Sequence, residues 1–266
     1  MASALHYRFS AGSGPTAVLL HELGGTLESF AAVADQLGGR MQLLRYDRPG
    51  AGRSPARPGA LTLDDHADDL ARLMAETGLR QPVHLVATAA GALVAVAFAM
   101  RWRPRVAGLV LCAPALGADP ARQDVLEARA RLAEDQGMAA IADATLALSY
   151  PAAYRQAGEA FARYRNDFLA QDPAAYAAMA RLLARAQMGP ALSALGLPCL
   201  LVAGADDVMR PPGAITALAA CIPGAETAIV ASGHLVPVQA PRETADLLAA
   251  FVARTPTPAS GGPRHA

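Results

Sequence analysis

The stretch VHLVATAAGALVAVAFAM, residues 83–100, decides the fold. It carries no charged residue and resembles a membrane span in length. It also contains His84, Thr88 and Gly91 and is rich in alanine, which a buried strand, a tight turn and a buried helix explain better than a bilayer. The stretch therefore predicts a strand–turn–helix unit inside a globular core, and we expect no membrane association.

The same alternation of short apolar runs and helical patterns extends in both directions. Strands are predicted at residues 17–20, 41–46, 83–87, 106–112, 197–203 and 226–230, and helices at residues 28–37, 63–76, 90–101, 213–220 and 242–254. The helix over 63–76 has Asp64 and Asp65 in its first turn and Gly78 just past its end, both typical boundary signals. Strands that alternate with helices predict an α/β fold, a mostly parallel sheet covered by helices on both faces.

The alternation stops once, between about residues 119 and 195, where only Ala- and Arg-rich helical patterns occur. We therefore expect an α/β core formed by residues 1–118 and 196–254, a helical insertion at 119–195 and a disordered tail at 255–266, rich in proline and glycine. Six of the 13 aromatic residues lie in the insertion. They form either its own core or the roof of a substrate pocket.

Composition excludes several kinds of chemistry. The 266 residues include 64 alanines and no lysine, so all 23 basic residues are arginine, and the formal net charge is +0. Without lysine there is no Schiff-base nucleophile, no pyridoxal anchor and no Walker-type phosphate loop. A net charge of zero also argues against a nucleic-acid-binding protein, which usually carries a basic excess.

The cysteines indicate neither a metal site nor a disulfide framework. Cys112, Cys199 and Cys221 are scattered and form no C-x-x-C pair, so a reducing, cytoplasmic setting is expected. Residues 1–10 lack the apolar segment of a signal peptide. We expect no metal and no cofactor, and a small-molecule substrate as the partner. The sequence leaves open whether the chain forms a homo-oligomer.

Four stretches carry a resemblance to a known family. LLHELGG at residues 19–25 follows a predicted strand, VATAAG at 86–91 joins a strand to a helix, and GADDVMRP at 204–211 and GHLVP at 233–237 each follow a late strand. Over nearly the whole chain this resembles the α/β-hydrolase fold, and in particular the 3-oxoadipate enol-lactonase-like proteins. The turn DRPGAGRS at 47–54 is similar to the family's D-x-R-G-x-G-x-S loop, and the helical insertion corresponds to its cap domain.

The resemblance implies a nucleophile on a tight strand-to-helix turn, then an acid, then a histidine. Asp207 and His234 stand where the family has the last two, so His234 is implied as the general base and Asp207 as the carboxylate that orients it. Ala89 stands at the nucleophile position and offers no hydroxyl, thiol or carboxylate. Thr88 is adjacent, but the side chain of a neighbour on such a turn points elsewhere. Because covalent catalysis depends strictly on geometry, we do not expect Thr88 to replace the missing nucleophile.

The resemblance also implies an oxyanion hole made by the backbone N–H groups of Leu23 and Ala90, neither of which depends on a side chain. Glu22 stands where many members have glycine. It is either a loop carboxylate bound to backbone donors or an arginine, or a pocket carboxylate that assists proton transfer. His21 is implied to hold this loop in place. We expect surface or strand positions for the other histidines, His6, His66, His84 and His265.

Two explanations of Ala89 stay open. It is either an engineered knockout of an ordinary serine esterase or lactonase, or a natural residue in a protein that forms no acyl-enzyme. Glu22 favours the second, because a knockout changes one position only. A natural enzyme would use His234 on water to cleave an ester or lactone, or on a small, largely apolar carbonyl compound as a cofactor-free lyase or oxygenase. A non-catalytic protein that binds a small ligand is the third alternative.

Overall fold

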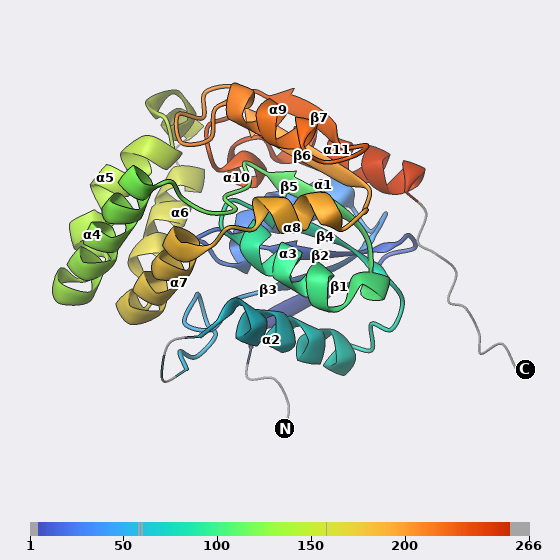
Figure 1. The fold of residues 1–266 in the computed structure, drawn as a ribbon, viewed down its shortest axis with the longest axis horizontal. Coiled ribbons are helices and arrows are strands. Elements are labelled where there is room, and N and C mark those ends of the chain that lie inside the picture. The colour runs from blue at the N-terminus through green and yellow to red at the C-terminus, as the bar shows by residue number, and fades with distance from the viewer. Residues whose placement is uncertain (1–4, 58, 60, 158, 256–266) are drawn as a thin grey trace, which may run out of the picture.

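The computed structural model describes residues 5–57, 59, 61–157 and 159–255, and its centre is a seven-stranded sheet of order β1-β3-β2-β4-β5-β6-β7 (Figure 1). All neighbouring strands are parallel except β1, which pairs antiparallel with β3 at the edge. The strands are β1 (Tyr7–Ser10), β2 (Thr16–Leu20), β3 (Gln42–Tyr46), β4 (Val83–Thr88), β5 (Val106–Cys112), β6 (Cys199–Gly204) and β7 (Glu226–Val230).

Helices cover both faces of the sheet. One face packs on α1 and α11, and the other on α2, α3 and α9, each over its own cluster of buried apolar side chains. The core helices are α1 (Ala31–Leu37), α2 (Leu63–Glu76), α3 (Gly91–Arg101), α9 (Pro212–Ala220), α10 (Val236–Gln239) and α11 (Pro241–Arg254), with 3-10 turns η1 (Leu27–Phe30) and η2 (Arg103–Arg105). The predicted α/β class is therefore confirmed.

The insertion between β5 and β6 is helical throughout its described part, where the only pairing of strand type is an isolated bridge between Gly117 and Gln187. Figure 1 shows α4 to α7 packed together at one side of the sheet. The elements are α4 (Pro120–Gln136), α5 (Ala139–Ser149), η3 (Ala152–Ala157), α6 (Glu159–Leu169), α7 (Pro173–Arg185) and α8 (Gly189–Ala194). The tail predicted at 255–266 lies outside the described residues from position 256 onward.

The structure differs from the predicted elements in three places. The edge strand β1 was not predicted, since its four residues are too few for a clear alternation and Tyr7 and Phe9 remain exposed. The helix expected over 28–37 is split, because Thr26 caps a 3-10 turn before α1 begins at Ala31. The four-residue α10 was also missed, since one helical turn leaves no periodic pattern.

No helix in the part of the chain that the structure describes is long and apolar enough to cross a bilayer. The charge-free stretch at 83–100 instead divides into the buried strand β4 and the buried helix α3.

Candidate active site

The turn between β4 and α3 places Ala89 at the carboxyl edge of the sheet. Its φ of 45° lies in the left-handed region, which L-residues other than glycine adopt rarely and at a cost in energy. Two backbone hydrogen bonds to the end of β5 and the loop after it hold it there: the Ala89 N–H donates to the Cys112 carbonyl at 2.9 Å, and the Ala89 carbonyl accepts from the Ala115 N–H at 3.1 Å. The turn thus fixes the Ala89 methyl group against the cavity described below.

Gly91 explains how α3 begins so close to the sheet. A Cβ at this position would lie 2.5 Å from the Leu20 carbonyl oxygen and 2.7 Å from that of His21. Both contacts are with backbone and are shorter than real Cβ contacts. The helix can approach β2 this closely only because residue 91 has no side chain.

The loops after β6 and β7 bring Asp207 and His234 together. His234 Nδ1 lies 2.8 Å from Asp207 Oδ2, and both side chains are buried. Asp207 Oδ1 accepts the N–H groups of Met209 and Arg210 at 2.8 and 3.0 Å. Burial alone would raise the pKa of Asp207, but its bond and charge interaction with His234 and these two N–H donors hold the pKa below its usual value. Asp207 therefore stays ionised and orients the imidazole, which leaves Nε2 of His234 for chemistry.

The two backbone groups implied for the oxyanion hole border the same cavity. Leu23 and Ala90 both line it, and within the described part of the chain neither N–H donates a hydrogen bond. Buried N–H groups are nearly always paired, so two free donors at one cavity are suited to an anionic oxygen.

His21 holds the loop that carries Leu23. Its Nε2 accepts the Arg48 N–H at 3.1 Å, which places the proton on Nδ1, and that N–H donates to the Glu22 carbonyl at 2.8 Å. Burial and then the charge of Arg48 lower the pKa of His21 well below its usual value. His21 is therefore neutral and acts as a backbone clamp, as the resemblance implies.

Glu22 is a buried carboxyl group that lines the cavity. Its Oε1 accepts the Ser29 hydroxyl at 2.8 Å, whereas Oε2 has no hydrogen-bond partner among the described residues. Burial raises the pKa of Glu22, and the backbone N–H of Glu22 itself and the side chains of Ser29, Tyr164 and Arg48 oppose this rise only in part. Both predicted roles therefore keep support, because Glu22 interacts with a backbone donor and an arginine and also lines the cavity.

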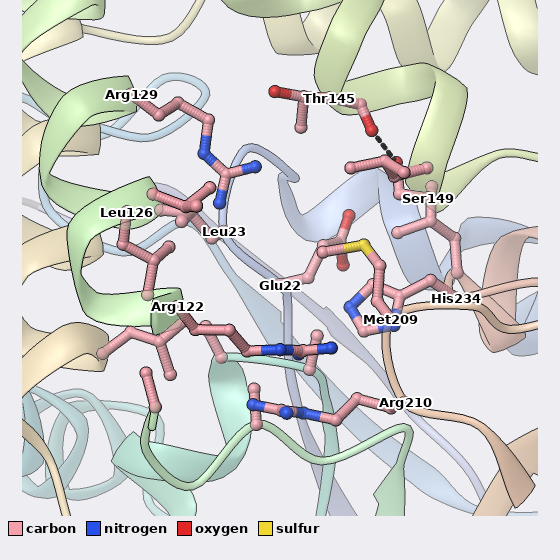
Figure 2. Close-up of a pocket in the computed structure, with 18 of the residues that line it drawn as sticks. Glu22, Leu23, Arg122, Leu126, Arg129, Thr145, Ser149, Met209, Arg210 and His234 are labelled. Atoms are coloured by element: carbon pink, nitrogen blue, oxygen red, sulfur yellow. Dashed lines mark hydrogen bonds between the residues drawn. The ribbon is translucent and has the colours of Figure 1, made fainter. Parts of the chain in front are cut away.

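These groups surround a cavity of about 260 Å³ between the sheet edge and the helical insertion (Figure 2). Most of its wall is apolar. The core contributes Glu22, Leu23, Ala89, Ala90, Ala115, Ala118, Val208, Met209, Arg210, His234 and Leu235, and the insertion contributes Arg122, Val125, Leu126, Arg129, Thr145, Leu148, Ser149, Tyr164, Phe168, Tyr176 and Leu183.

The insertion's aromatic residues serve both predicted purposes. Tyr150, Tyr164, Phe168 and Tyr176 are buried in the cluster that forms the insertion's core, and the last three also line the cavity.

The sequence analysis did not identify the arginines of the insertion that line the cavity, Arg122 and Arg129. Arginines are frequent throughout this insertion, and the sequence does not distinguish those that face inward.

Other sequence candidates lie elsewhere. Thr88 is fully buried and is not among the residues that line the cavity. Asp206 accepts the Tyr154 hydroxyl at 2.6 Å. The surface-or-strand expectation holds for His84 on β4 but not for His66, which is buried on α2. No group of three His, Cys, Asp or Glu side chains suited to a metal ion occurs among residues 5–57, 59, 61–157 and 159–255.

The sheet topology, with a left-handed turn after β4 and an acid and a histidine after β6 and β7, defines the class of the protein as an α/β hydrolase. The pattern of the family described as serine aminopeptidase, S33, matches residues 15–233, and the chain belongs to this family.

Relatives of this chain include enzymes of several names. RutD of Caulobacter segnis, named for carbamate hydrolysis, is 30% identical over 227 residues, which cover 83% of this chain and 85% of RutD. A thermophilic esterase from Thermogutta terrifontis, solved with malate bound, has a TM-score of 0.87 at 27% identity, covering 94% of both chains. The enol-lactonase from Burkholderia xenovorans LB400 has a TM-score of 0.85 at 27% identity, covering 94% of this chain and 96% of that one. The predicted α/β-hydrolase resemblance is confirmed.

Proposed function

We propose that this chain hydrolyses a small carbonyl compound, an ester, lactone or carbamate with a largely apolar body, by general-base attack of water and without an acyl-enzyme. The observation that carries the proposal is the placement of three groups on one cavity: His234, oriented by Asp207 at 2.8 Å, and the free N–H groups of Leu23 and Ala90. The relatives named above support the substrate class, because a carbamate, an ester and an enol-lactone all present a carbonyl carbon joined to a heteroatom leaving group.

The reaction needs only these groups and water. Nε2 of His234 accepts a proton from water while the water oxygen bonds to the carbonyl carbon. The carbonyl oxygen takes the negative charge and accepts the N–H groups of Leu23 and Ala90. When the tetrahedral adduct collapses, the bond to the leaving heteroatom breaks, and His234 returns the proton to that atom.

Ala89 decides between this route and the acyl-enzyme route. A methyl group cannot attack a carbonyl carbon, so as written the chain lacks the group that forms an ester with the acyl part of a substrate. The oxyanion hole and binding alone sustain a rate on the order of 10³–10⁴-fold over water when a triad member is absent. Direct water attack assisted by His234 adds general-base catalysis to that residual rate.

The same groups are also suited to removing a proton beside a ketone and holding the enolate, which is the first step of a cofactor-free lyase or oxygenase. Hydrolysis is the better proposal, because hydrolysis is what the names of the relatives describe.

A panel of small esters, lactones and carbamates tests the proposal. We expect slow turnover without a burst, and His234→Ala should abolish it. Undiminished turnover in His234→Ala would contradict the proposal. Tight binding without any turnover in the unmodified chain would instead identify a non-catalytic binding protein. Sequencing codon 89 in the source gene separates an engineered alanine from a natural one.

A further inference from the structure

Three arginine side chains line the cavity that holds His234. Arg122 and Arg129 lie seven residues apart on α4, a spacing of two helical turns that puts them on one face. Arg210 comes from the loop after β6, three residues beyond Asp207. Figure 2 shows Arg122 and Arg210 reaching toward each other from opposite sides, with Arg129 pointing into the same space from above.

These guanidinium groups have no acidic partner. In the described part of the chain, no carboxylate oxygen lies within 4.0 Å of a guanidinium nitrogen of Arg122, Arg129 or Arg210, whereas the Arg131 guanidinium on the same helix pairs with Glu127 at 3.0 Å. Nε of Arg129 is buried without any hydrogen-bond partner. A buried charged donor without a partner is costly, which makes such a group a candidate ligand site.

Arg210 is held in place by hydrogen bonds from its side chain and from its backbone. Its Nη2 donates to the Gly117 carbonyl at 2.9 Å, and its own N–H donates to Asp207 Oδ1 at 3.0 Å. Burial, followed by the positive charge of Arg122, lowers the pKa of Arg210, and the charges of Asp207 and Asp119 oppose this decrease only in part, which indicates that the two guanidinium groups lie close enough to repel. An anion between them would relieve this repulsion.

The acids around the cavity cannot supply that anion. Asp207 is occupied by His234 and by two N–H groups. Asp119 caps α4, where it accepts the Arg122 backbone N–H at 2.9 Å. Glu22 is held by Ser29, and burial raises its pKa toward the neutral form. Because these acids are engaged elsewhere and compensate the charge of Arg210 only in part, a further negative charge at this site would have to come from a ligand.

We propose that the substrate carries a carboxylate, which Arg122, Arg129 and Arg210 bind within the cavity that contains His234. A planar carboxylate matches the forked donors of guanidinium groups. The cavity that holds the arginines and His234 is otherwise mostly apolar, with Val125, Leu126 and Leu235 among its lining residues, which fits a short hydrocarbon body. The inference rests on the proposed function and narrows its substrate to an anionic carbonyl compound.

The carboxylate site can be tested by measuring the affinities of two matched ligands, an experiment that does not depend on turnover. The pair is 5-oxohexanoate and 5-oxohexanamide, which share a ketone and a chain length but differ in charge. Calorimetry at low ionic strength should show that the acid binds at least about tenfold more tightly, because hydrogen bonds between charged groups are the strong ones. Added salt should reduce the difference.

Arg122→Gln and Arg129→Gln should each lower the affinity for the acid about tenfold and leave that for the amide unchanged. Arg131→Gln is the matched control, since this exposed residue of the same helix does not line the cavity. Arg210→Gln should lower the affinity for the acid in the same way if this variant folds. If it does not fold, Arg122→Gln and Arg129→Gln are sufficient to test the carboxylate site.

The outcomes separate the inference from the proposed function. Equal binding of acid and amide, or a preference that survives both α4 substitutions, overturns the inference, while loss of turnover in His234→Ala would still support hydrolysis. If the preference depends on the α4 arginines but His234→Ala turns over normally, the carboxylate site stands and the proposed mechanism fails.

Discussion

Asp207 makes three hydrogen bonds that together fix His234: Oδ2 binds the imidazole Nδ1 at 2.8 Å, and Oδ1 accepts two backbone N–H groups. Asp207→Asn keeps the size of the side chain but removes its charge and one acceptor. We expect turnover to fall on the order of 10²–10⁴-fold, the usual contribution of a general base, because the ring loses its orientation and its stabilised charged form. Steady-state kinetics on any substrate found in the ester panel measures the loss.

Asp206→Asn provides the matched control for this prediction. Asp206 is adjacent in sequence but exposed, and its side chain accepts the Tyr154 hydroxyl at 2.6 Å and makes no hydrogen bond to His234 among the described residues. Its substitution should change turnover less than about threefold, because the exchange of an exposed charge usually has a small effect. Equal losses in the two variants would mean that the loop, and not the His234 contact, limits the rate.

Ala89→Ser tests whether the turn still presents a nucleophile. Because φ at this residue is 45° and Ala89 lines the cavity with His234, a serine here should react with a fluorophosphonate probe and show a burst with an activated ester. The double variant Ala89→Ser/His234→Ala should lose both signals, since the hydroxyl is then not activated. A serine that neither labels nor bursts would show that the cavity no longer serves acyl transfer.

Much of this arrangement was predictable from sequence, because the strands and tight turns that position it leave local signals. The helix over 63–76 was predicted with both ends correct from its acidic first turn and from Gly78 just past its end, and the structure adds a capping box of Thr62 and Asp65 at its start. The roles of Asp207 and His234 were implied by the family resemblance, which places an acid and a histidine in the loops after two late strands. The structure adds their contact, which depends on two loops 27 residues apart meeting at one sheet edge.

The cavity arginines and the environment of Glu22 were not predictable in the same way. Whether Arg122 or Arg131 faces inward depends on how α4 packs against α7, and no periodic pattern in this Ala- and Arg-rich helix reveals it. Glu22 could be placed in the loop, but its contact with Ser29 and its position beside Tyr164 come from separate elements. Such properties depend on tertiary contacts and not on local sequence.

Gly91→Ala should destabilise the fold. The added methyl group would lie 2.5 Å from the Leu20 carbonyl oxygen, so α3 must move away from β2. Overpacking of this kind costs about 1–3 kcal/mol, which urea unfolding measures as a lower midpoint. Gly213→Ala on α9 is the control, because nothing lies within 4 Å of its added Cβ. It should leave the midpoint unchanged or raise it, since alanine favours a helix more than glycine does.

Glu22→Gln should make stability less dependent on pH. Burial raises the pKa of Glu22 in the folded chain, so between its unfolded value of 4.5 and its folded value the folded state binds more protons than the unfolded state. The free energy of unfolding contributed by this group is therefore largest below pH 4.5 and falls as the pH rises toward the folded pKa. Glutamine is neutral at every pH and cannot lose a proton.

Urea unfolding of the two proteins at pH 4.5 and at pH 8 measures this difference. The stability of Glu22→Gln relative to the unmodified chain should be greater at pH 8 than at pH 4.5, by about 1.4 kcal/mol for each unit by which the folded pKa is raised. The comparison cancels the opposite contribution of Asp207, which is present in both proteins. A difference that is the same at both pH values would mean that Glu22 ionises in the folded chain as it does in the unfolded one, and that its carboxyl group does not face the cavity in neutral form.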